Sequence, residues 1–120
     1  MYTALVLDES SKQKLLSIMD PELLKEYDRI NAHHMTINMG PCQMPTELGK
    51  PYTMQVVGIG RDEKVLAVMV ESECTSKNKI KHVTIGFNTA KGGSAKLSNN
   101  LTNWEPFSGP SLNGTVQECA

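Results

Sequence analysis

The chain contains one four-residue pattern twice, as HMTI at residues 34–37 and as HVTI at residues 82–85. The first copy lies in the alternating run HHMTINM (33–39), and the second lies in IKHVTIGF (80–87), which is rich in β-favouring residues. Both runs are typical of β-strands. Because alternate side chains of a strand share a face, each strand should present one imidazole and one hydroxyl on one face and apolar side chains to the core on the other.

The alternation predicts a face for every side chain of these two strands. We expect the polar face to carry His34, Thr36, Asn38, His82, Thr84 and Gly86. We expect the core face to carry Met35, Ile37, Met39, Val83, Ile85 and Phe87. By the same rule, His33 should face away from His34.

The repeated residue types suit acid–base chemistry at phosphorus. Imidazole has an ordinary pKa of about 6.5, so near neutral pH one ring can be neutral while another is protonated. A neutral ring can take a proton from water or a ribose hydroxyl, and a protonated ring can deliver one to a leaving alkoxide. Threonine hydroxyls can donate hydrogen bonds to the non-bridging oxygens of a phosphodiester. We therefore predict His34 and His82 as the acid–base pair and Thr36 and Thr84 as phosphate ligands.

The sequence offers few residues for a metal site. His33 is the only other histidine, and the carboxylates form no cluster with metal-ligand spacing. The three cysteines, Cys42, Cys74 and Cys119, lie far apart and include no Cys-x-x-Cys pair, so neither a zinc site nor a disulfide framework is expected. The chemistry is therefore predicted to need no metal and no cofactor.

The rest of the chain predicts an α+β domain with a mainly antiparallel sheet. Further strands are expected at residues 2–7, 54–59, 65–70 and 112–119, with a hairpin turn at 60–64 and a loop over 40–53. Ser10 and Ser11 are predicted to cap a first helix, and Asp20-Pro21 should start a second. Ser94 is expected to cap a short helix that runs through Leu101.

Length and charge limit the function classes. The chain has 120 residues and a net charge of −1, which predicts one domain, residues 1–120, and argues against a protein that holds duplex DNA by its phosphates alone. No apolar stretch is long enough for a membrane span, and the N-terminus does not resemble a signal peptide. The cysteine usage predicts reduced thiols in a cytosolic setting, which includes the cytosol of a host cell. Oligomeric state stays open.

The two His-x-Thr strands resemble those of the two-histidine (2H) phosphoesterase superfamily. The wider segments AHHMTINMG, SKNKIKHVTIGFN and LTNWEPF are similar to the small branch described as Swiss Army Knife RNA repair-like, and the likeness spans nearly the whole chain. It implies a compact bilobal α+β fold with pseudo-twofold symmetry and a central cleft. Because the spacing between the motifs is shorter than in many relatives, the second lobe should be trimmed and the cleft open.

The resemblance also implies an activity. Carried over by position, His34 and His82 become the acid–base pair and Thr36 and Thr84 the phosphate-oxygen ligands. The family implies hydrolysis of cyclic phosphodiesters or 2′-linked nucleotides, and RNA end processing in some branches. Some small viral relatives cleave cyclic nucleotide signals of host immunity. We therefore expect a small nucleotide or an RNA end as substrate, with long RNA left open.

A few other residues have both a functional and a structural interpretation. Trp104 and Phe107 flank Pro106 in an irregular segment and could stack on a base, while Trp104 could equally cover one end of the core. Tyr2 could face the cleft or the core, and we favour the core. A sparse basic run could attract a polyanion but is more simply a solvated segment; it comprises Lys77, Lys79 and Lys81.

Two alternatives to an enzyme stay open. A binding module could use the same cleft to hold a nucleotide or an RNA end without cleaving it. A structural or interaction protein could carry the repeat by coincidence. The position of the two histidines separates the last alternative from the others, because a catalytic pair must face one cleft.

Overall fold

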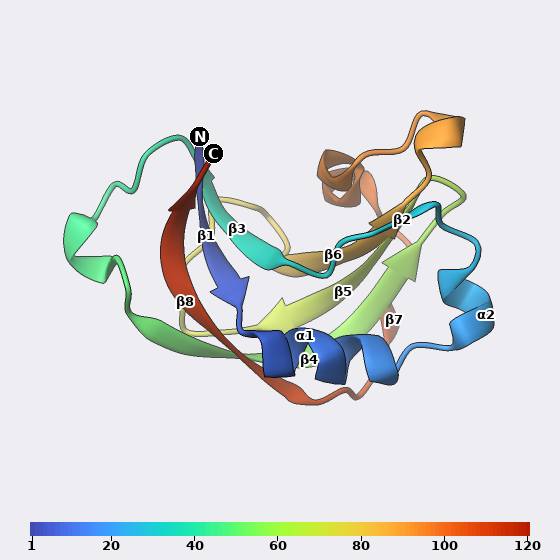
Figure 1. The fold of residues 1–120 in the computed structure, drawn as a ribbon, viewed down its shortest axis with the longest axis horizontal. Coiled ribbons are helices and arrows are strands. Elements are labelled where there is room, and N and C mark those ends of the chain that lie inside the picture. Colours follow the sequence, from blue (N-terminus) through green and yellow to red (C-terminus); the bar gives the residue numbers. More distant parts are fainter.

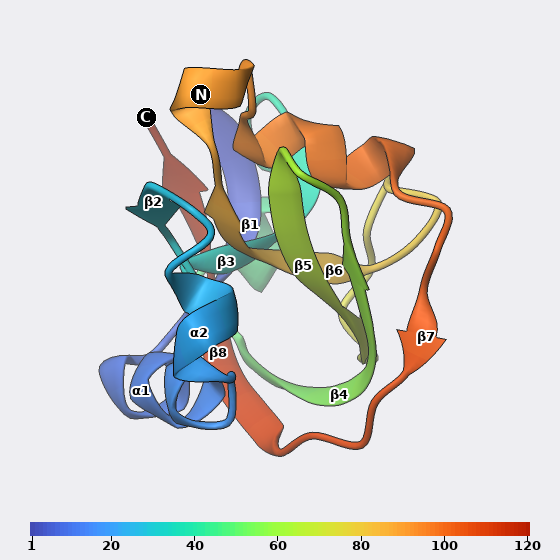
Figure 2. The ribbon, with the colours of Figure 1, turned by 90° about the vertical axis from the view of Figure 1, so that its right-hand side faces the viewer.

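Six strands pair in a closed circuit in the computed structural model, which describes residues 1–120 (Figure 1; Figure 2). In chain order the elements are β1 (Tyr2–Leu7), α1 (Glu9–Ser17), α2 (Pro21–Leu24), β2 (Arg29–Ile30), β3 (His34–Met39), η1 (Pro45–Glu47), β4 (Pro51–Arg61), β5 (Val65–Glu71), β6 (His82–Phe87), η2 (Thr89–Lys91), η3 (Ala95–Asn100), β7 (Glu105–Pro106) and β8 (Ser111–Cys119), where η marks a 3-10 helix. The predicted α+β class with a mainly antiparallel sheet is confirmed, since every strand pair is antiparallel.

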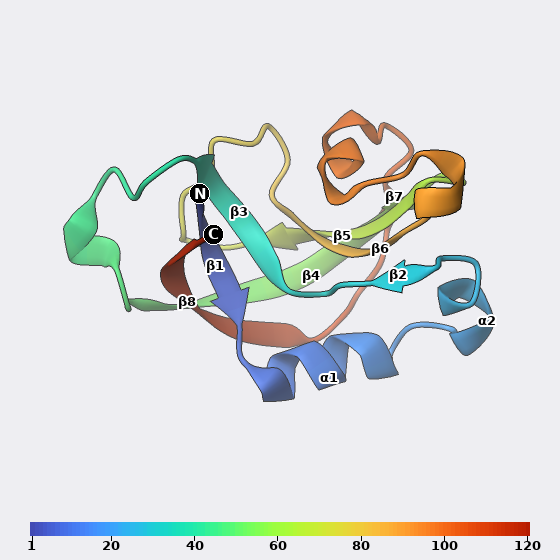
Figure 3. The same cartoon turned by 45° about the horizontal axis from the view of Figure 1, so that its top comes forward.

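The circuit runs β6–β3–β1–β8–β4–β5 and returns to β6, with β2 added beside β6 and β7 beside β4. β1 pairs along its whole length with the last part of β8, from Tyr2 opposite Cys119 to Leu7 opposite Gly114, so the chain termini lie side by side (Figure 1). The helix α1 lies against β8, while η3 covers β5 and β6 on the other side (Figure 3). None of the helices has the length and apolarity needed to cross a bilayer.

The two motif strands have the same register with their outer neighbours. Thr36 of β3 lies opposite Ala4 of β1, and Thr84 of β6 lies opposite Ala67 of β5. In each pair the register then shifts by one residue, so that Ile37 and Ile85 are left without a partner. Each motif strand therefore carries a β-bulge at the isoleucine that follows its threonine.

Because of the bulges, the faces predicted for the residues after Ile37 and Ile85 are wrong. One extra residue reverses the alternation of side chains, so the residues after it exchange faces. Met39, predicted on the core face, is 79% exposed and shares a cavity with His34, while Asn38 is buried on the other side of β3. Phe87 likewise lines the histidine cavity and is absent from the main apolar cluster, although it packs against a smaller one formed by Val65, Ala67 and Leu101.

Before the bulges the predicted core face is confirmed. Met35, Val83 and Ile85 have no exposed surface. They belong to one large apolar cluster, together with Leu5 of β1 and Leu112 of β8. Burial of apolar surface in this cluster is the main favourable contribution to the fold and fixes β3 and β6 from the core side.

The helix starts were predicted in part. Asp8, not Ser10 or Ser11, caps α1, because its carboxylate accepts the Ser11 N–H at 2.7 Å. Ser11 is buried instead, and its hydroxyl accepts a hydrogen bond from the Asn113 N–H of β8. Asp20 caps α2 and Pro21 is its first residue, as predicted.

Two other boundaries differ from the sequence prediction. β4 begins at Pro51 and ends at Arg61, since its first residues pair with β8 and its last with β5. The segment after Ser94 is a 3-10 helix, and the Ser94 side chain makes no capping bond. The extent of β4 comes from its pairing with distant strands, which the local sequence does not contain.

The Gly60→Ala substitution should destabilise the protein by about 1–3 kcal/mol, as overpacking of a well-packed site does. A Cβ at Gly60 would lie 2.7 Å from the Cε3 atom of Trp104, so the indole must shift. Urea unfolding followed by circular dichroism measures the change. The exposed Thr53 of the same strand gives the control, Thr53→Ala, which should change stability by no more than about 0.5 kcal/mol. Equal stability of the Gly60→Ala variant and the wild type would contradict the contact.

Candidate active site

One cavity contains both histidines and both threonines of the repeated motif. It has a volume of about 350 Å³, and we call it the histidine cavity. Besides His34, Thr36, His82 and Thr84, its wall comprises Tyr2, Asn31, Met39, Asn78, Phe87, Ala95, Lys96 and Asn99. The repeat is therefore not scattered over separate surfaces, and the structure brings together all four residues predicted from it.

The pairing of β3 with β6 sets the arrangement of these four side chains. The two strands run antiparallel and are in register at Met35 and Val83. On the face opposite those two residues, this register places each histidine beside the threonine of the other strand, His34 by Thr84 and Thr36 by His82. Two imidazoles and two hydroxyls thus form a compact polar group at the base of the cavity.

The wall of the histidine cavity contains no carboxylate, and its one charged residue is Lys96. The lysine makes no ion pair, since the three salt bridges of the chain involve other residues. By contrast, an acidic cavity elsewhere on the molecule, bounded by β4 and the 62–63 turn, is lined by Glu26, Asp62, Glu63 and Glu105. A phosphate therefore meets no like charge in the histidine cavity.

His34 is held as a neutral base. Burial lowers its pKa to about 4, and the charges of His33 and His82 act in the same direction. Its Nδ1 lies 2.9 Å from the Nδ1 of His33, so one of the two rings donates a hydrogen bond and the other accepts it. The expectation that His33 faces away from His34 is therefore wrong, and His33 is a site residue that the sequence reasoning missed.

The contact between His33 and His34 follows from the backbone just before β3. Ala32 is fully buried and has a φ of +46°, in the left-handed region that non-glycine residues seldom adopt. The N–H groups of Asn31 and Ala32 donate to carbonyls of β6. The carbonyl of the next residue, His33, accepts a hydrogen bond from the Leu7 N–H of β1. The chain turns at Ala32 from one strand to the other, so strand alternation does not apply to His33.

His82 is 6% exposed and is anchored through its backbone-facing nitrogen. Its Nδ1–H donates to the Ile80 carbonyl at 2.8 Å, which leaves Nε2 as the free nitrogen. Burial lowers the pKa of His82, and the hydrogen bond to Ile80 opposes that shift by favouring the protonated ring. Of the two histidines, His82 is thus the one whose protonated ring is stabilised by a carbonyl, that of Ile80.

The two threonine hydroxyls differ. The Thr36 hydroxyl makes no hydrogen bond within the chain, although the Thr36 carbonyl accepts one from Ser76. The Thr84 hydroxyl lies 2.7 Å from Ser98 Oγ and 3.3 Å from the Ala95 carbonyl, both in η3. Thr36 can therefore donate to a ligand at once, while Thr84 must give up a contact with η3 to do so.

The three aromatic residues Tyr2, Trp104 and Phe107 differ in how close they lie to the histidine cavity. Tyr2 lines the histidine cavity, with its ring centroid 4.9 Å from that of His34, so the prediction that it faces the core is wrong. The Trp104 ring lies 6.3 Å from the His82 ring and also packs against a small apolar cluster. Phe107 packs against the main core and does not reach the histidine cavity.

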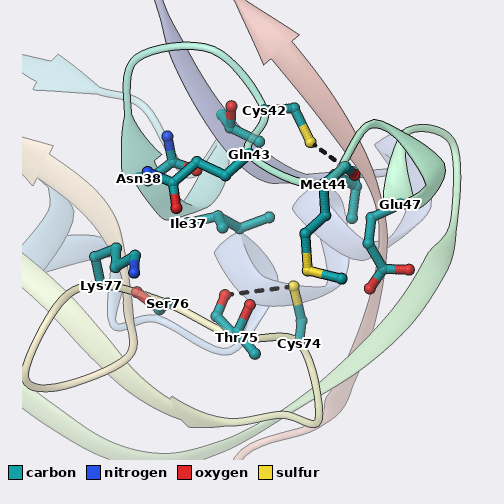
Figure 4. Close-up of a pocket in the computed structure, with 12 residues that line it drawn as sticks. Ile37, Asn38, Cys42, Gln43, Met44, Glu47, Cys74, Thr75, Ser76 and Lys77 are labelled. Atoms are coloured by element: carbon teal, nitrogen blue, oxygen red, sulfur yellow. Dashed lines mark hydrogen bonds between the residues drawn. The ribbon is translucent and has the colours of Figure 1, made fainter.

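A further cavity of about 300 Å³ lies on the other side of β3 (Figure 4). Ile37 and Asn38 line it from β3, and Cys42, Met44 and Cys74 approach from two loops. We call it the thiol cavity. It contains no histidine, and its wall includes the carboxylate of Glu47, so it lacks the features that suit the histidine cavity to a phosphodiester. No group of three or more histidine, cysteine or acidic side chains that could hold a metal ion occurs in the structure.

Acidification from pH 6.5 to 5 should lower the free energy of unfolding by about 1–2 kcal/mol through His34 alone. The unfolded chain binds this proton near pH 6.5, whereas the folded chain binds it near pH 4, so the stabilisation is complete above 6.5 and is lost as the pH falls. Urea unfolding at several pH values measures it, and the His34→Gln variant should lose this part of the pH dependence. His82 acts in the same direction, so a smaller dependence should remain. An unchanged dependence in His34→Gln would contradict the burial of a neutral His34.

Known proteins do not supply a family for this chain. No protein-family model matches it, and no curated protein matches it either. A function must therefore be argued from the histidine cavity. It has a buried His82 and a half-buried His34, both of lowered pKa, one free and one engaged threonine hydroxyl, and a wall without carboxylates.

Proposed function

We propose that this chain is a metal-independent phosphodiesterase of the two-histidine type that hydrolyses a cyclic or 2′-linked nucleotide phosphodiester. The observation that carries the proposal is the histidine cavity, where His34 and His82 lie beside Thr84 and Thr36 with no acidic residue in the wall. Two acid–base groups and hydroxyl donors in one anion-tolerant cavity are what displacement at phosphorus requires.

His34 is best suited to act as the base. Its low pKa keeps the ring neutral at physiological pH. In the tautomer whose Nδ1–H is donated to His33, Nε2 is free to accept a proton. In the proposed step Nε2 takes a proton from water as the water oxygen attacks phosphorus. A ribose hydroxyl in place of water would instead give a cyclic phosphate product.

His82 is best suited to act as the acid. Its Nδ1–H is already donated to the Ile80 carbonyl, which stabilises the protonated ring and directs Nε2 at the cavity. A bound phosphate raises the pKa of both rings because it favours their charged forms. As the bond between phosphorus and the leaving oxygen breaks, His82 Nε2 delivers its proton to that oxygen.

Thr36 is the readier ligand for a non-bridging phosphate oxygen, because its hydroxyl has no partner in the chain. Thr84 serves the same role once its hydroxyl turns from the Ala95 carbonyl toward the ligand. Ser98 then keeps Thr84 in position, since a hydroxyl can accept one hydrogen bond while it donates another.

The likeness to the two-histidine superfamily also implies a fold of two lobes related by a pseudo-twofold axis, and this arrangement is part of the same proposal. Its support is the matched register of the two halves: β3–β1–β8 and β6–β5–β4 each begin with a motif strand that bulges at the same isoleucine. The axis would pass between β3 and β6 near Met35 and Val83.

The proposal also includes a cytosolic site of action. The role would be either RNA end processing or the removal of cyclic nucleotide signals, including viral counter-defence. The three cysteines are free thiols, as expected in a reducing compartment.

The His34→Ala and His82→Ala variants should each lose at least about a hundredfold in kcat/KM, the lower end of what a positioned acid or base contributes. Activity of the wild type should survive EDTA. Mass spectrometry after incubation with 2′,3′-cyclic mononucleotides, 2′,5′-oligoadenylate, cyclic di- and trinucleotides and RNA with a cyclic-phosphate end measures turnover. Circular dichroism checks that both variants fold. Full activity of either variant would sink the assignment, and tight binding of a nucleotide that is recovered unchanged would favour a binding module.

The His33→Gln variant should keep turnover but move the acid limb of the pH profile of kcat/KM to higher pH. The glutamine amide oxygen can still accept the His34 Nδ1–H, but glutamine cannot carry the charge through which His33 lowers the pKa of His34. The profile is measured between pH 4 and 8 for the wild type and for this variant. An acid limb that stays in place would show that His34 is not the base or that His33 does not act on it.

A further inference from the structure

We propose that a second cavity on the far side of His82 binds the nucleotide on the leaving-group side of the scissile phosphate. This inference rests on the proposed function and narrows its substrate class. The substrate then has a nucleoside on both sides of the phosphate and carries at least a second phosphate, as in a linear or cyclic oligonucleotide. A 2′,3′-cyclic mononucleotide would fill only the histidine cavity.

The second cavity has a volume of about 540 Å³ and includes Trp104 in its wall, so we call it the tryptophan cavity. It meets the histidine cavity at His82, which lines both, as do Asn78 and Asn99. A phosphodiester held beside His82 therefore has room for one organic group on each side. Both volumes fall within the usual range for small-molecule sites.

Trp104 provides a fixed aromatic surface in the tryptophan cavity. Its Nε1–H donates to the Leu101 carbonyl at 3.1 Å, and its ring rests on Gly60, where the missing side chain permits close approach. The ring is thus held in place before a ligand arrives. A base can stack on such a ring whatever its identity, because every base has a π-face.

Two lysines make the tryptophan cavity suitable for a second phosphate. Lys77 and Lys79 are exposed, line this cavity, and form none of the salt bridges of the chain. The wall contains no carboxylate, as is also true of the histidine cavity. The basic run that could be taken from the sequence for a solvated segment therefore lies next to the proposed acid.

The position of the tryptophan cavity also agrees with the proposed role of His82. The acid must lie next to the leaving oxygen, so the nucleoside that leaves belongs on the same side as His82. On the other side, Tyr2 lies against the ring of His34. One aromatic ring thus accompanies each histidine, as expected if a base lies on either side of the phosphate.

Trp104 is the only tryptophan of the chain, so its fluorescence reports directly on the tryptophan cavity. The His34→Ala variant, which should bind without cleaving and whose changed residue does not line this cavity, is titrated with 2′,5′- and 3′,5′-linked diadenylates that carry a phosphate at both ends, so that the leaving nucleoside bears a second phosphate whichever oxygen leaves. Adenosine 2′,3′-cyclic phosphate is titrated in parallel. A phosphorothioate diadenylate with the wild type gives the same measurement if the variant does not fold.

We expect a saturable fluorescence change with at least one diadenylate and little change with the cyclic mononucleotide. The Lys77→Ala/Lys79→Ala double variant should bind the diadenylate at least about tenfold more weakly, since each lysine can donate a charge-assisted hydrogen bond to the second phosphate. The matched control, Lys12→Ala/Lys14→Ala in α1, makes the same change in net charge and should leave the affinity unchanged.

The outcomes separate this subsite from the proposed function. A fluorescence change and lysine dependence without any hydrolysis by the wild type would support the subsite and contradict the phosphodiesterase. Hydrolysis of a diadenylate without a fluorescence change, or with equal loss in the two lysine pairs, would overturn the subsite alone. Equal kcat/KM for the cyclic mononucleotide and the diadenylates would also overturn it, and absence of both binding and hydrolysis for every ligand would overturn both proposals.

Discussion

One backbone contact, the pairing of β3 with β6 at Met35 and Val83, brings the two motifs together. On one side of this seam the two apolar residues are completely buried, and on the other the histidine of each strand lies beside the threonine of its neighbour. The seam itself is short, so its stability depends on the longer ladders that β3 forms with β1 and β6 forms with β5. Closing the circuit through β8 and β4 holds those two ladders together and fixes the cavity from the outside.

The bulges at Ile37 and Ile85 decide which residues complete the cavity. Without them Met39 and Phe87 would follow the alternation into the core, as the sequence suggested. With them both strands bend after the threonine and turn an apolar side chain beside the polar group. The result is a small polar base with apolar rims, which suits a phosphate that carries nucleosides. The same bulge on both strands is stronger support for a duplicated arrangement than the sequence repeat, because it involves the neighbouring strands as well.

The six longer strands, their mainly antiparallel pairing and the choice of the four motif residues could be predicted from the sequence because they depend on short-range patterns: alternation, apolar runs and turn residues. The two-residue strands β2 and β7 were not predicted. What the sequence did not reveal depends on distant partners. The faces of Asn38 and Met39 follow from a register with β1, and the contact of His33 with His34 follows from the left-handed turn at Ala32. The engagement of the Thr84 hydroxyl depends on η3. The left-handed turn has no local signal, since alanine usually avoids that conformation.

Burial of two histidines in one cavity is costly for the protein alone, because both lose favourable hydration and neither can be protonated easily. An anion between them reverses this balance: it raises the pKa of both rings and gives the free Thr36 hydroxyl a partner. The chain as a whole has a net charge of −1, so the attraction for an anion is local to the carboxylate-free cavities around His82, with their lysines Lys77, Lys79 and Lys96. In the folded chain one nitrogen of each ring has a hydrogen-bond partner, whereas the Thr36 hydroxyl and the second nitrogen of each ring have none. These free groups are available to a phosphate, which supports the proposed site.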